Sequence, residues 1–286
     1  MDDFALQLAA FNAQIEQELQ DGRLSFPTVL ELSMRIKQLA DDPNSSLKDI
    51  ANAVRAEPVL SAKTLRMANT VQINPYPGQI STVNDAVVRV GLAALRCLAY
   101  AVAAEQLTRD HRSGRMRLIA AGLWLHSVDV GCWAYALAAQ LKIANPDSAL
   151  LAGLMRTIGQ FYLLAKAADY PALERDMNRF AEFVATWNAP MSSAILETFS
   201  LPEHILDALD DTELYGDVWP PSDLSDVLFV AALAAETPNP FDTMLGVTRR
   251  PELLEACTGG LDRAQLDALI DAARATKQEM LAAVCN

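Results

Sequence analysis

Apolar residues recur at spacings of three and four along most of this chain. That period places them on one face of an α-helix, and no convincing run of alternating apolar and polar residues predicts a β-strand. The last such segment, from about Asp262 to Val284, predicts a C-terminal helix that braces the rest of the protein. Its apolar residues fall on one side: Leu261, Leu266, Leu269, Ile270 and Met280. The pattern predicts an all-α protein, a multi-helix bundle.

The starts of several helices are marked by prolines and by capping residues. Pro27 and Pro58 suit first helical turns, because proline lacks an N–H that the first turn does not use. Ser46-x-x-Asp49 and Thr82-x-x-Asp85 resemble capping boxes. Asn145-Pro-Asp147 predicts the start of a helix that continues through residues 156 and 157 and ends before Pro171.

Proline-rich stretches predict the interruptions between helices. Gln72–Gln79 contains two prolines and a glycine, so we expect a loop between Asn69 and the helix that begins near Thr82. Further breaks are predicted at four later places, none of which is typical of a flexible linker: Asn188-Ala-Pro190, Leu201-Pro202, Trp219-Pro-Pro221 and Thr237-Pro-Asn-Pro240.

One apolar stretch, Leu118–Ala139, imitates a membrane span. Its sole charged residue is Asp129, but His126, Ser127 and Asp129 lie near its middle, where hydrocarbon would penalise them. A helix buried in the bundle explains the stretch better, and we expect no membrane span.

Composition narrows the class of protein. A chain of 286 residues, 51% of them hydrophobic, can bury the core of one or two domains. The net charge is −13 and there is no long run of Lys or Arg, so direct nucleic-acid binding is disfavoured. The cysteines are far apart, which indicates reduced thiols and not a zinc or redox site: Cys97, Cys132, Cys257 and Cys285. Because the acidic N-terminus lacks the features of a secretory signal, we expect a cytoplasmic protein.

Several motifs, in a fixed order from about Arg23 to Tyr215, resemble those of the HD-related output domain, abbreviated HDOD. They are Phe26-Pro-x-x-Leu30, Asp42-Pro-Asn-Ser-Ser-Leu47, Ile50-Ala-x-x-Val54, Glu57-Pro-x-Leu60, Ala62-Lys-Thr-Leu-Arg-Met-Ala-Asn-Thr70, Ile80-Ser-Thr-Val-Asn-Asp-Ala-Val-Val-Arg-Val-Gly91, Trp124-x-His126-Ser127 and the Ala152-Gly-Leu region. Each motif is weak alone, but the ordered set is specific.

The resemblance implies a helical N-terminal part packed on a degenerate half that is similar to the HD phosphohydrolases, used in bacterial signalling and not in hydrolysis. The expected division places these two parts at residues 23–110 and 111–215, after an N-terminal helix at 1–22. A helical extension at 216–286 is expected to pack on the same core.

The segment Leu150–Gly159 is similar to the HD helix that carries a metal-binding His-Asp pair. In this chain Arg156 and Thr157 stand in those two places, and neither replaces the lost ligands, since a guanidinium has no lone pair for a cation. His126 falls at a matching place, while Pro190 or a neighbour occupies the later histidine position and Leu209-Asp-Asp-Thr212 replaces a His-rich end. We therefore expect no metal, no cofactor and no enzymatic activity.

The remaining polar residues of this half are open to two interpretations. His126 and Asp129 lie one helical turn apart, so Asp129 could hydrogen-bond His126; a histidine satisfied in this local way is favoured over a metal ligand. Arg156 could bind an anion in a remnant pocket, but pairing with a core carboxylate such as Asp129 is favoured. His204 is expected at the surface and His111 in a polar turn.

Two residues of the N-terminal part and two tryptophans need a similar comparison. Arg66 and Asn69 lie three positions apart on one helix and could bind a partner, although Asn69 is better explained as fixing the following proline-rich loop through its amide. Trp124 and Trp133 are expected in the core, not in a site that stacks a ligand.

These observations favour a non-catalytic signalling module that acts by binding a protein partner. Two alternatives stay open: a sensor in which Arg156 receives a nucleotide or another anion, and a phosphohydrolase with an atypical metal site built from His126, Asp129, Asp210 and Asp211. The sequence leaves open whether the protein is a homodimer.

Overall fold

The computed structural model has helices and no β-strand among the residues that it describes. These residues are 3–22, 24, 35–36, 38–39, 42, 44–75, 78–109, 113–199, 203–210, 219–247 and 263–285. The helices are α1 (Asp3–Asp21), α3 (Leu47–Arg55), α4 (Pro58–Ala68), α5 (Val83–Arg109), α6 (Gly114–Leu141), α7 (Pro146–Met155), α8 (Ile158–Lys166), α9 (Met177–Phe199), α10 (Glu203–Asp210), α11 (Leu224–Ala234), α12 (Pro240–Met244) and α14 (Arg263–Cys285), with short 3-10 helices η2 (Ala167–Asp169) and η3 (Pro171–Arg175). The all-α prediction is confirmed.

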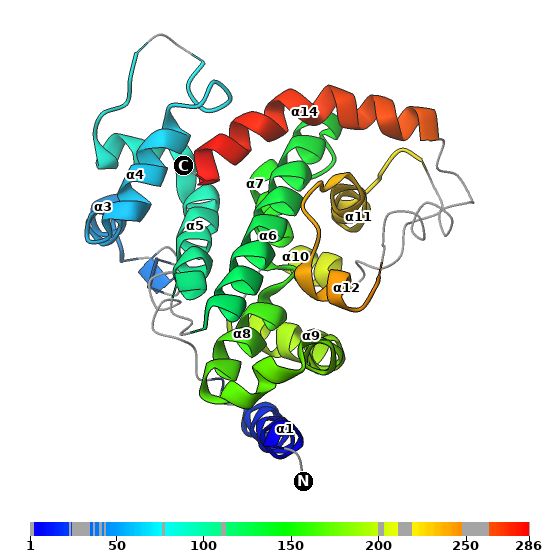
Figure 1. The fold of residues 1–286 in the computed structure, drawn as a ribbon. Helices are drawn as coiled ribbons and strands as arrows, with labels where there is room; N and C mark the ends of the chain where they lie inside the picture. Colours follow the sequence, from blue (N-terminus) through cyan, green and yellow to red (C-terminus); the bar gives the residue numbers. More distant parts are fainter. Residues whose placement is uncertain are drawn as a thin grey trace.

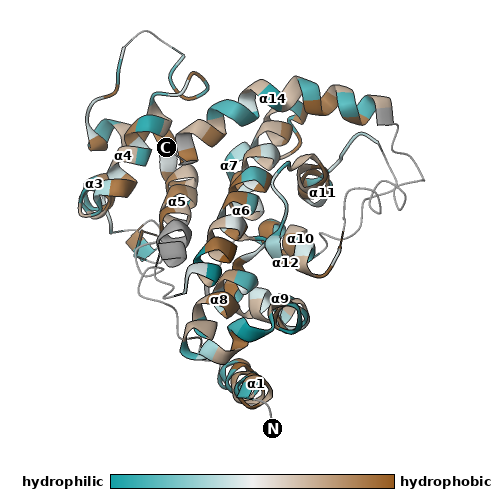
Figure 2. Ribbon diagram, viewed as in Figure 1, coloured by the Kyte–Doolittle hydropathy of each residue, from teal (hydrophilic) through white to brown (hydrophobic). Residues whose placement is uncertain are grey.

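Helix α6 forms the centre of the bundle, and α5, α7, α11 and α14 pack against it (Figure 1). Nearly all of its residues from Ser127 to Ala138 are buried, and so are Trp124 and Trp133, which confirms that both tryptophans belong to the core. Hydrophobic residues dominate α6, α8 and α11, whereas α1 and α14 carry many hydrophilic residues (Figure 2). The apolar stretch Leu118–Ala139 is therefore the middle of a core helix.

A different segment is the most apolar long helical stretch among the described residues. By length and composition alone, Pro146–Asp169 could cross a membrane, but 83% of its most apolar window is buried inside the protein. The two crossing helices α6 and α7 approach closely where Gly131 meets Gly153, since a Cβ atom on Gly153 would lie 2.6 Å from the Gly131 Cα. Both segments are apolar because they pack on each other in the core.

Local sequence signals position most helix starts as expected. Ser46 and Asp49 form a complete capping box at α3, and Pro58 lies in the first turn of α4. The Thr82 hydroxyl accepts from the Asp85 amide at 3.1 Å, and Asn145 caps α7. Pro27 lies outside the described residues.

Two predicted helix boundaries were wrong. The helix that opens at Asn145 does not continue through residues 156 and 157, because α7 ends at Met155 and α8 begins at Ile158. Pro190 lies inside α9 and does not break it. Its ring is exposed, and so is Thr186, whose carbonyl loses the usual bond to residue 190; water can hydrate that carbonyl on the outer face.

The other predicted breaks have different outcomes. Trp219–Pro221 and Thr237–Asn239 are non-helical, as expected, and they bracket α11. Leu201 and Pro202 lie outside the described residues. Helix α5 also bends within its length, since Gly91 has φ of 80°, a conformation that few other residues adopt.

The N-terminal helix α1 lies at one end of the molecule, against η3 and α9 (Figure 1). Glu18 of α1 pairs with Lys166 of α8 at 3.0 Å and also accepts a hydrogen bond from Tyr162. Burial raises the pKa of Glu18, but the bonds from Tyr162, Gln14 and Lys166 outweigh burial and leave it below its usual value.

Helix α14 lies across α6 and reaches α4 at its C-terminal end (Figure 1). A stripe of buried residues faces this core: Leu266, Ile270, Ala273, Lys277, Met280 and Val284. Leu269 is half-buried and Leu261 lies outside the described residues. Lys63 of α4 donates to the Val284 carbonyl, and Arg66 donates to the Ala282 carbonyl at 3.5 Å. Helix α14 therefore packs against both α6 and α4.

Candidate functional site

The residues predicted from the HD pattern meet where α6 crosses the junction between α7 and α8. His126 and Asp129 lie on α6, while Arg156 and Thr157 form the junction itself. The Thr157 hydroxyl lies 2.5 Å from the Ser127 hydroxyl, which in turn donates to the Leu123 carbonyl at 2.9 Å. Arg66 and Asn69 belong to a separate region, at the end of α4.

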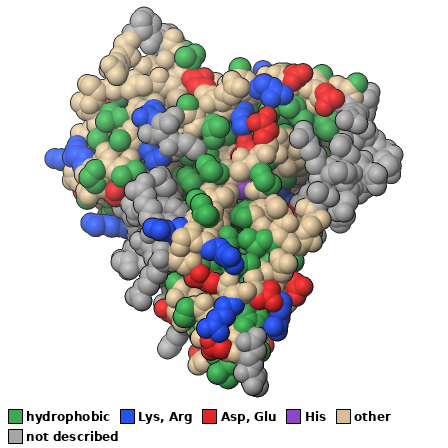
Figure 3. Space-filling view, viewed as in Figure 1, with side chains coloured by type: hydrophobic (Ala, Val, Ile, Leu, Met, Phe, Trp, Pro, Cys, Tyr) green, Lys and Arg blue, Asp and Glu red, His purple; other side chains and the backbone are tan. Residues whose placement is uncertain are grey.

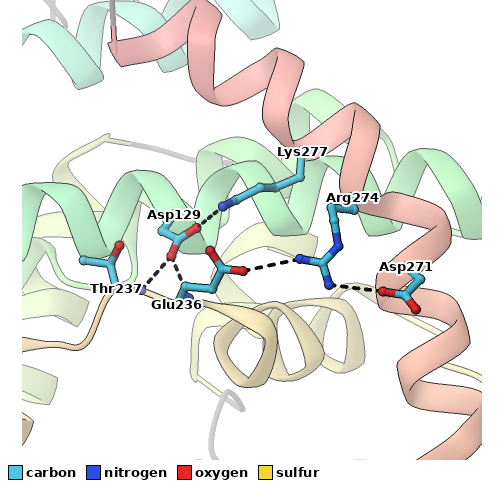
Figure 4. A network of polar contacts seen from close by, with 6 residues as sticks. All are labelled: Asp129, Glu236, Thr237, Asp271, Arg274 and Lys277. Carbon is cyan, nitrogen blue, oxygen red and sulfur yellow. Dashed lines mark hydrogen bonds and ion pairs between the residues drawn. The ribbon is translucent and has the colours of Figure 1, made fainter.

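Asp129 is held by α14 and by the segment that follows α11 (Figure 4). Its Oδ1 atom lies 2.8 Å from the Lys277 ammonium, and only 4% of the Asp129 side chain and 7% of the Lys277 side chain are exposed. Its Oδ2 atom accepts from the backbone amides of Glu236 and Thr237, at 2.7 and 2.8 Å. The carboxylate is thus neutralised by one cation and bonded by two amides, as a buried charge requires.

An exposed rim of charges lies beside this buried pair (Figure 4). Arg274 pairs with Glu236 at 3.4 Å and with Asp271 at 3.1 Å, and these side chains are between 44% and 73% exposed. Lys277 also lies 5.4 Å from the centre of the Trp133 ring, and the Arg274 guanidinium lies 6.0 Å from it. Cationic residues of α14 therefore cover the ring on α6 as well as the carboxylate.

His126 bonds to the same segment and not to Asp129. Its Nδ1 atom lies 2.8 Å from the Thr237 carbonyl oxygen, so Nδ1 carries the proton of this hydrogen bond. Burial lowers the pKa of His126, Arg156 lowers it further, and the Thr237 bond, Asp242 and Asp129 oppose this shift. The expected local bond between Asp129 and His126 was wrong, because Thr237 offers its carbonyl to the ring and its amide to the carboxylate.

The favoured pairing of Arg156 with Asp129 was also wrong. Arg156 is half-buried at the C-terminal end of α7, and the Asp129 carboxylate is occupied by Lys277 and the two amides. Thr157 is buried and engaged by Ser127. Lys277 therefore supplies the positive charge that we had assigned to Arg156.

The residues present do not fit a divalent metal of the kind that HD phosphohydrolases hold. Arg156 and Thr157 cannot replace a His-Asp pair, and both Asp129 oxygens already have strong partners. Among the described residues no group of three His, Cys, Asp or Glu side chains is placed to hold an ion. Asp211 of the alternative metal site lies outside the described residues, and so does His111.

A family model settles which family these features belong to. The model of the HDOD domain matches residues 26–213. The chain belongs to the HDOD domain family. The motifs that suggested this family fall almost entirely within the matched residues, so the predicted resemblance is confirmed. Among curated proteins, none matches the sequence.

Solved structures share the HDOD fold over nearly the whole chain. A protein provisionally named as a metal-dependent phosphohydrolase from Shewanella amazonensis SB2B is 23% identical with a TM-score of 0.67, over 98% of this chain and 100% of the other. An HDOD domain protein of unknown function from Geobacter sulfurreducens is 22% identical with a TM-score of 0.53, over 93% and 97%. At these identities the likeness shows the fold alone.

Gly159, at the end of the segment Leu150–Gly159, packs closely against α9. A Cβ atom on Gly159 would lie 2.5 Å from the Asn188 carbonyl oxygen and 2.6 Å from the Ser192 hydroxyl, both on α9. The Gly159 amide donates to that hydroxyl at 3.2 Å. Ile158-Gly159 is therefore needed to pack α8 on α9, independently of any chemistry.

Asn69, within the HDOD signature Ala62–Thr70, has the structural role that was predicted. The Asn69 amide donates to the Leu65 and Ile80 carbonyls and accepts from the Ile80 amide, each at 2.8 Å. Asn69 thereby closes the proline-rich loop at the end of α4. Arg66 is exposed nearby, and the two residues line an open groove of about 700 Å³ together with Glu279 and Ala282 of α14. His204 is exposed, as expected.

The sequence reasoning missed Lys277 and the segment at residues 236 and 237. A signal for Lys277 was present, because Ile270, Ala273, Lys277 and Met280 recur at helical spacing on one face. A lysine within an apolar stripe requires a buried anion or a path to solvent. Backbone groups such as the Thr237 carbonyl leave no comparable mark in a sequence.

Proposed function

We propose that this protein is a non-catalytic signalling module that acts by binding a partner protein. Membership of the HDOD family supports a role in signalling. The observation that carries the non-catalytic part is the closed set of contacts around Asp129, whose oxygens are held by Lys277 and by two backbone amides. A carboxylate held in this way braces three segments, and both of its oxygens face the protein's own Lys277 and backbone amides.

The proposed role in binding is supported by what the same contacts do for the fold. Asp129, His126 and Lys277 join α6, α14 and the segment after α11 into one rigid unit. A rigid unit loses little conformational entropy on association, which favours a preformed docking surface. A signalling module of this kind passes on its signal through the partner that it holds.

The proposed absence of catalysis is tested with purified protein, Mn²⁺ or Mg²⁺ and the generic substrate bis(p-nitrophenyl) phosphate. We expect no release of p-nitrophenol above that of the His126→Ala variant. The matched control is His204→Ala, which removes an exposed histidine. Metal-dependent turnover that His126→Ala abolishes and His204→Ala retains would instead establish a phosphohydrolase.

The binding part is tested by capture from the native bacterium, followed by reconstitution from two purified proteins. We expect a saturable complex that forms equally with and without EDTA. If no purified protein binds, and a nucleotide instead raises the melting temperature in a way that Arg156→Ala abolishes, the module is a ligand sensor.

A further inference from the structure

Helix α6 is mostly buried, yet two of its leucines are strongly exposed. Leu118 is 76% exposed and Leu125 is 50% exposed. Ala121 and Gly122, which lie between them, are half-buried. Seven positions separate the leucines, so both lie on one face of the helix. We call Leu118, Ala121 and Leu125 the bare face of α6.

The bare face continues directly into the part of α6 that α14 covers. Asp129 follows Leu125 by one helical turn, and it lies under Lys277 of α14. In the space-filling view, hydrophobic side chains gather over α6 below α14 (Figure 3). Helix α14 therefore covers one portion of this face of α6, at Asp129, and leaves the adjoining apolar portion open.

The bare face has the length that one further helix needs. Seven residues of α-helix span about 10 Å, and a helix with its side chains is about 10 to 12 Å wide. Helices pack at axial distances of about 8 to 10 Å. A Cβ atom on Gly122 would lie 3.6 Å from Pro240 of α12, so a second helix would pack on the Ala121 side of the bare face. Its apolar residues would contact Leu118 and Leu125.

Basic residues lie at the end of the bare face that is remote from α14. Arg115 and Arg117 are exposed in the first turn of α6. Arg115 donates to the Glu174 carbonyl at 3.2 Å, and Arg117 forms no ion pair with any other described residue. Below the hydrophobic side chains, Figure 3 shows Lys and Arg side chains together with Asp and Glu side chains. An occupant with acidic residues along that edge would complement these charges.

We propose that an amphipathic helix of a partner protein, acidic along one edge, packs beside α14 on the bare face of α6. This inference rests on the proposed function, since it names the surface and the chemistry through which the module binds. The recognition pairs two apolar helix faces, with contacts at Leu118 and Leu125, which lie two turns apart, and specificity from Arg115 and Arg117.

The test uses a fluorescent synthetic helix as the probe and anisotropy as the measurement. The peptide carries leucines at i, i+3, i+4 and i+7 with glutamates on its flanks, and a twin carries lysines in place of the glutamates. We expect the acidic peptide to bind and the lysine twin to bind more weakly. Leu118→Glu and Leu125→Glu should each weaken the binding of the acidic peptide about tenfold or more. Both residues are exposed, so these variants should keep the wild-type circular dichroism and melting temperature.

The matched control is Val88→Glu, a change at a residue of α5 that is 63% exposed and lies outside the bare face. It should leave the affinity unchanged. Arg115→Glu combined with Arg117→Glu should invert the preference toward the lysine twin. Equal binding of both peptides to every variant would overturn the proposal, and so would a dimer, seen by sedimentation, that Leu125→Glu dissociates.

Experiments on the complex with the native partner distinguish an error in the proposed docking surface from an error in the proposed function. If a captured partner still binds the Leu118→Glu, Leu125→Glu double variant with full affinity, the bare face is not the docking surface. The proposed function would then still stand. A partner lost from that variant and kept by Val88→Glu supports both.

Discussion

Two polar junctions of this protein, one half-buried at Asn69 and one buried at Asp129, differ in charge and in reach. At the first, the neutral Asn69 amide bonds Leu65 and Ile80, which lies 11 positions away. At the second, the Asp129 carboxylate bonds Lys277 and the segment after α11, more than a hundred positions away. The first closes a loop, and the second joins distant helices.

The difference matters when a partner is removed. Removal of the Asn69 amide leaves uncharged donors and acceptors without partners, and the free energy lost is that of unsatisfied hydrogen bonds. An ion pair that loses one member leaves an uncompensated charge in the interior, which costs considerably more. The ionic junction is therefore the more fragile of the two.

The largest expected effect is that of Lys277→Met, which keeps the bulk and removes the ammonium. We expect the free energy of unfolding to fall by about 3 to 5 kcal/mol, because Asp129 stays buried without its cation. Urea unfolding followed by circular dichroism measures this. The Asp129→Asn, Lys277→Met double variant should recover part of the loss; a double variant no more stable than Lys277→Met would show that the charge is not the cause.

Asn69→Ala should have a smaller effect on the same measurement. We expect a loss of about 1 to 3 kcal/mol, because the Ile80 amide and carbonyl lose their partner. Gln72→Ala, an exposed change in the same loop, is the control and should alter stability by about 0.5 kcal/mol or less. If both variants behave alike, Asn69 does not close the loop.

The ionic junction should also respond to pH through His126. Its pKa is lowered in the folded protein by burial and by Arg156, against Asp242, Asp129 and the Thr237 bond. The unfolded chain therefore takes up this proton first, and stability is lost as pH falls below about 6.5. Urea unfolding between pH 8 and pH 5 should show a smaller decline for His126→Gln than for the wild type. Parallel curves would contradict the lowered pKa.

The smallest expected effect is that of Arg274→Ala, at the exposed rim of the ionic junction. The pairs with Glu236 and Asp271 are solvated, so we expect a loss of about 1 kcal/mol or less that added salt reduces. Comparison with Lys277→Met in low and high salt isolates the role of burial. A salt-independent loss as large as that of Lys277→Met would mean that the rim and the buried pair are equivalent.

The same two junctions show how far the sequence could be interpreted. Helix starts and the role of Asn69 depend on residues close in the chain. The Ser46–Asp49 capping box was predicted, and so was the fixing of the following loop by the Asn69 amide, although its partner Ile80 was not. The partners of Asp129 and His126 depend on how α11 and α14 return to α6, which no local pattern encodes. The break at residues 156 and 157 was missed for a similar reason, since the apolar run continues across it.

The contact between Lys63 and the Val284 carbonyl has a consequence for folding kinetics. The two residues are 221 positions apart, so the chain must close a very long loop before this bond can form. Local helix pairs such as α6 with α7 close much shorter loops and should assemble sooner. We expect α14 to dock last, and amide hydrogen exchange during refolding should protect its backbone later than that of α7.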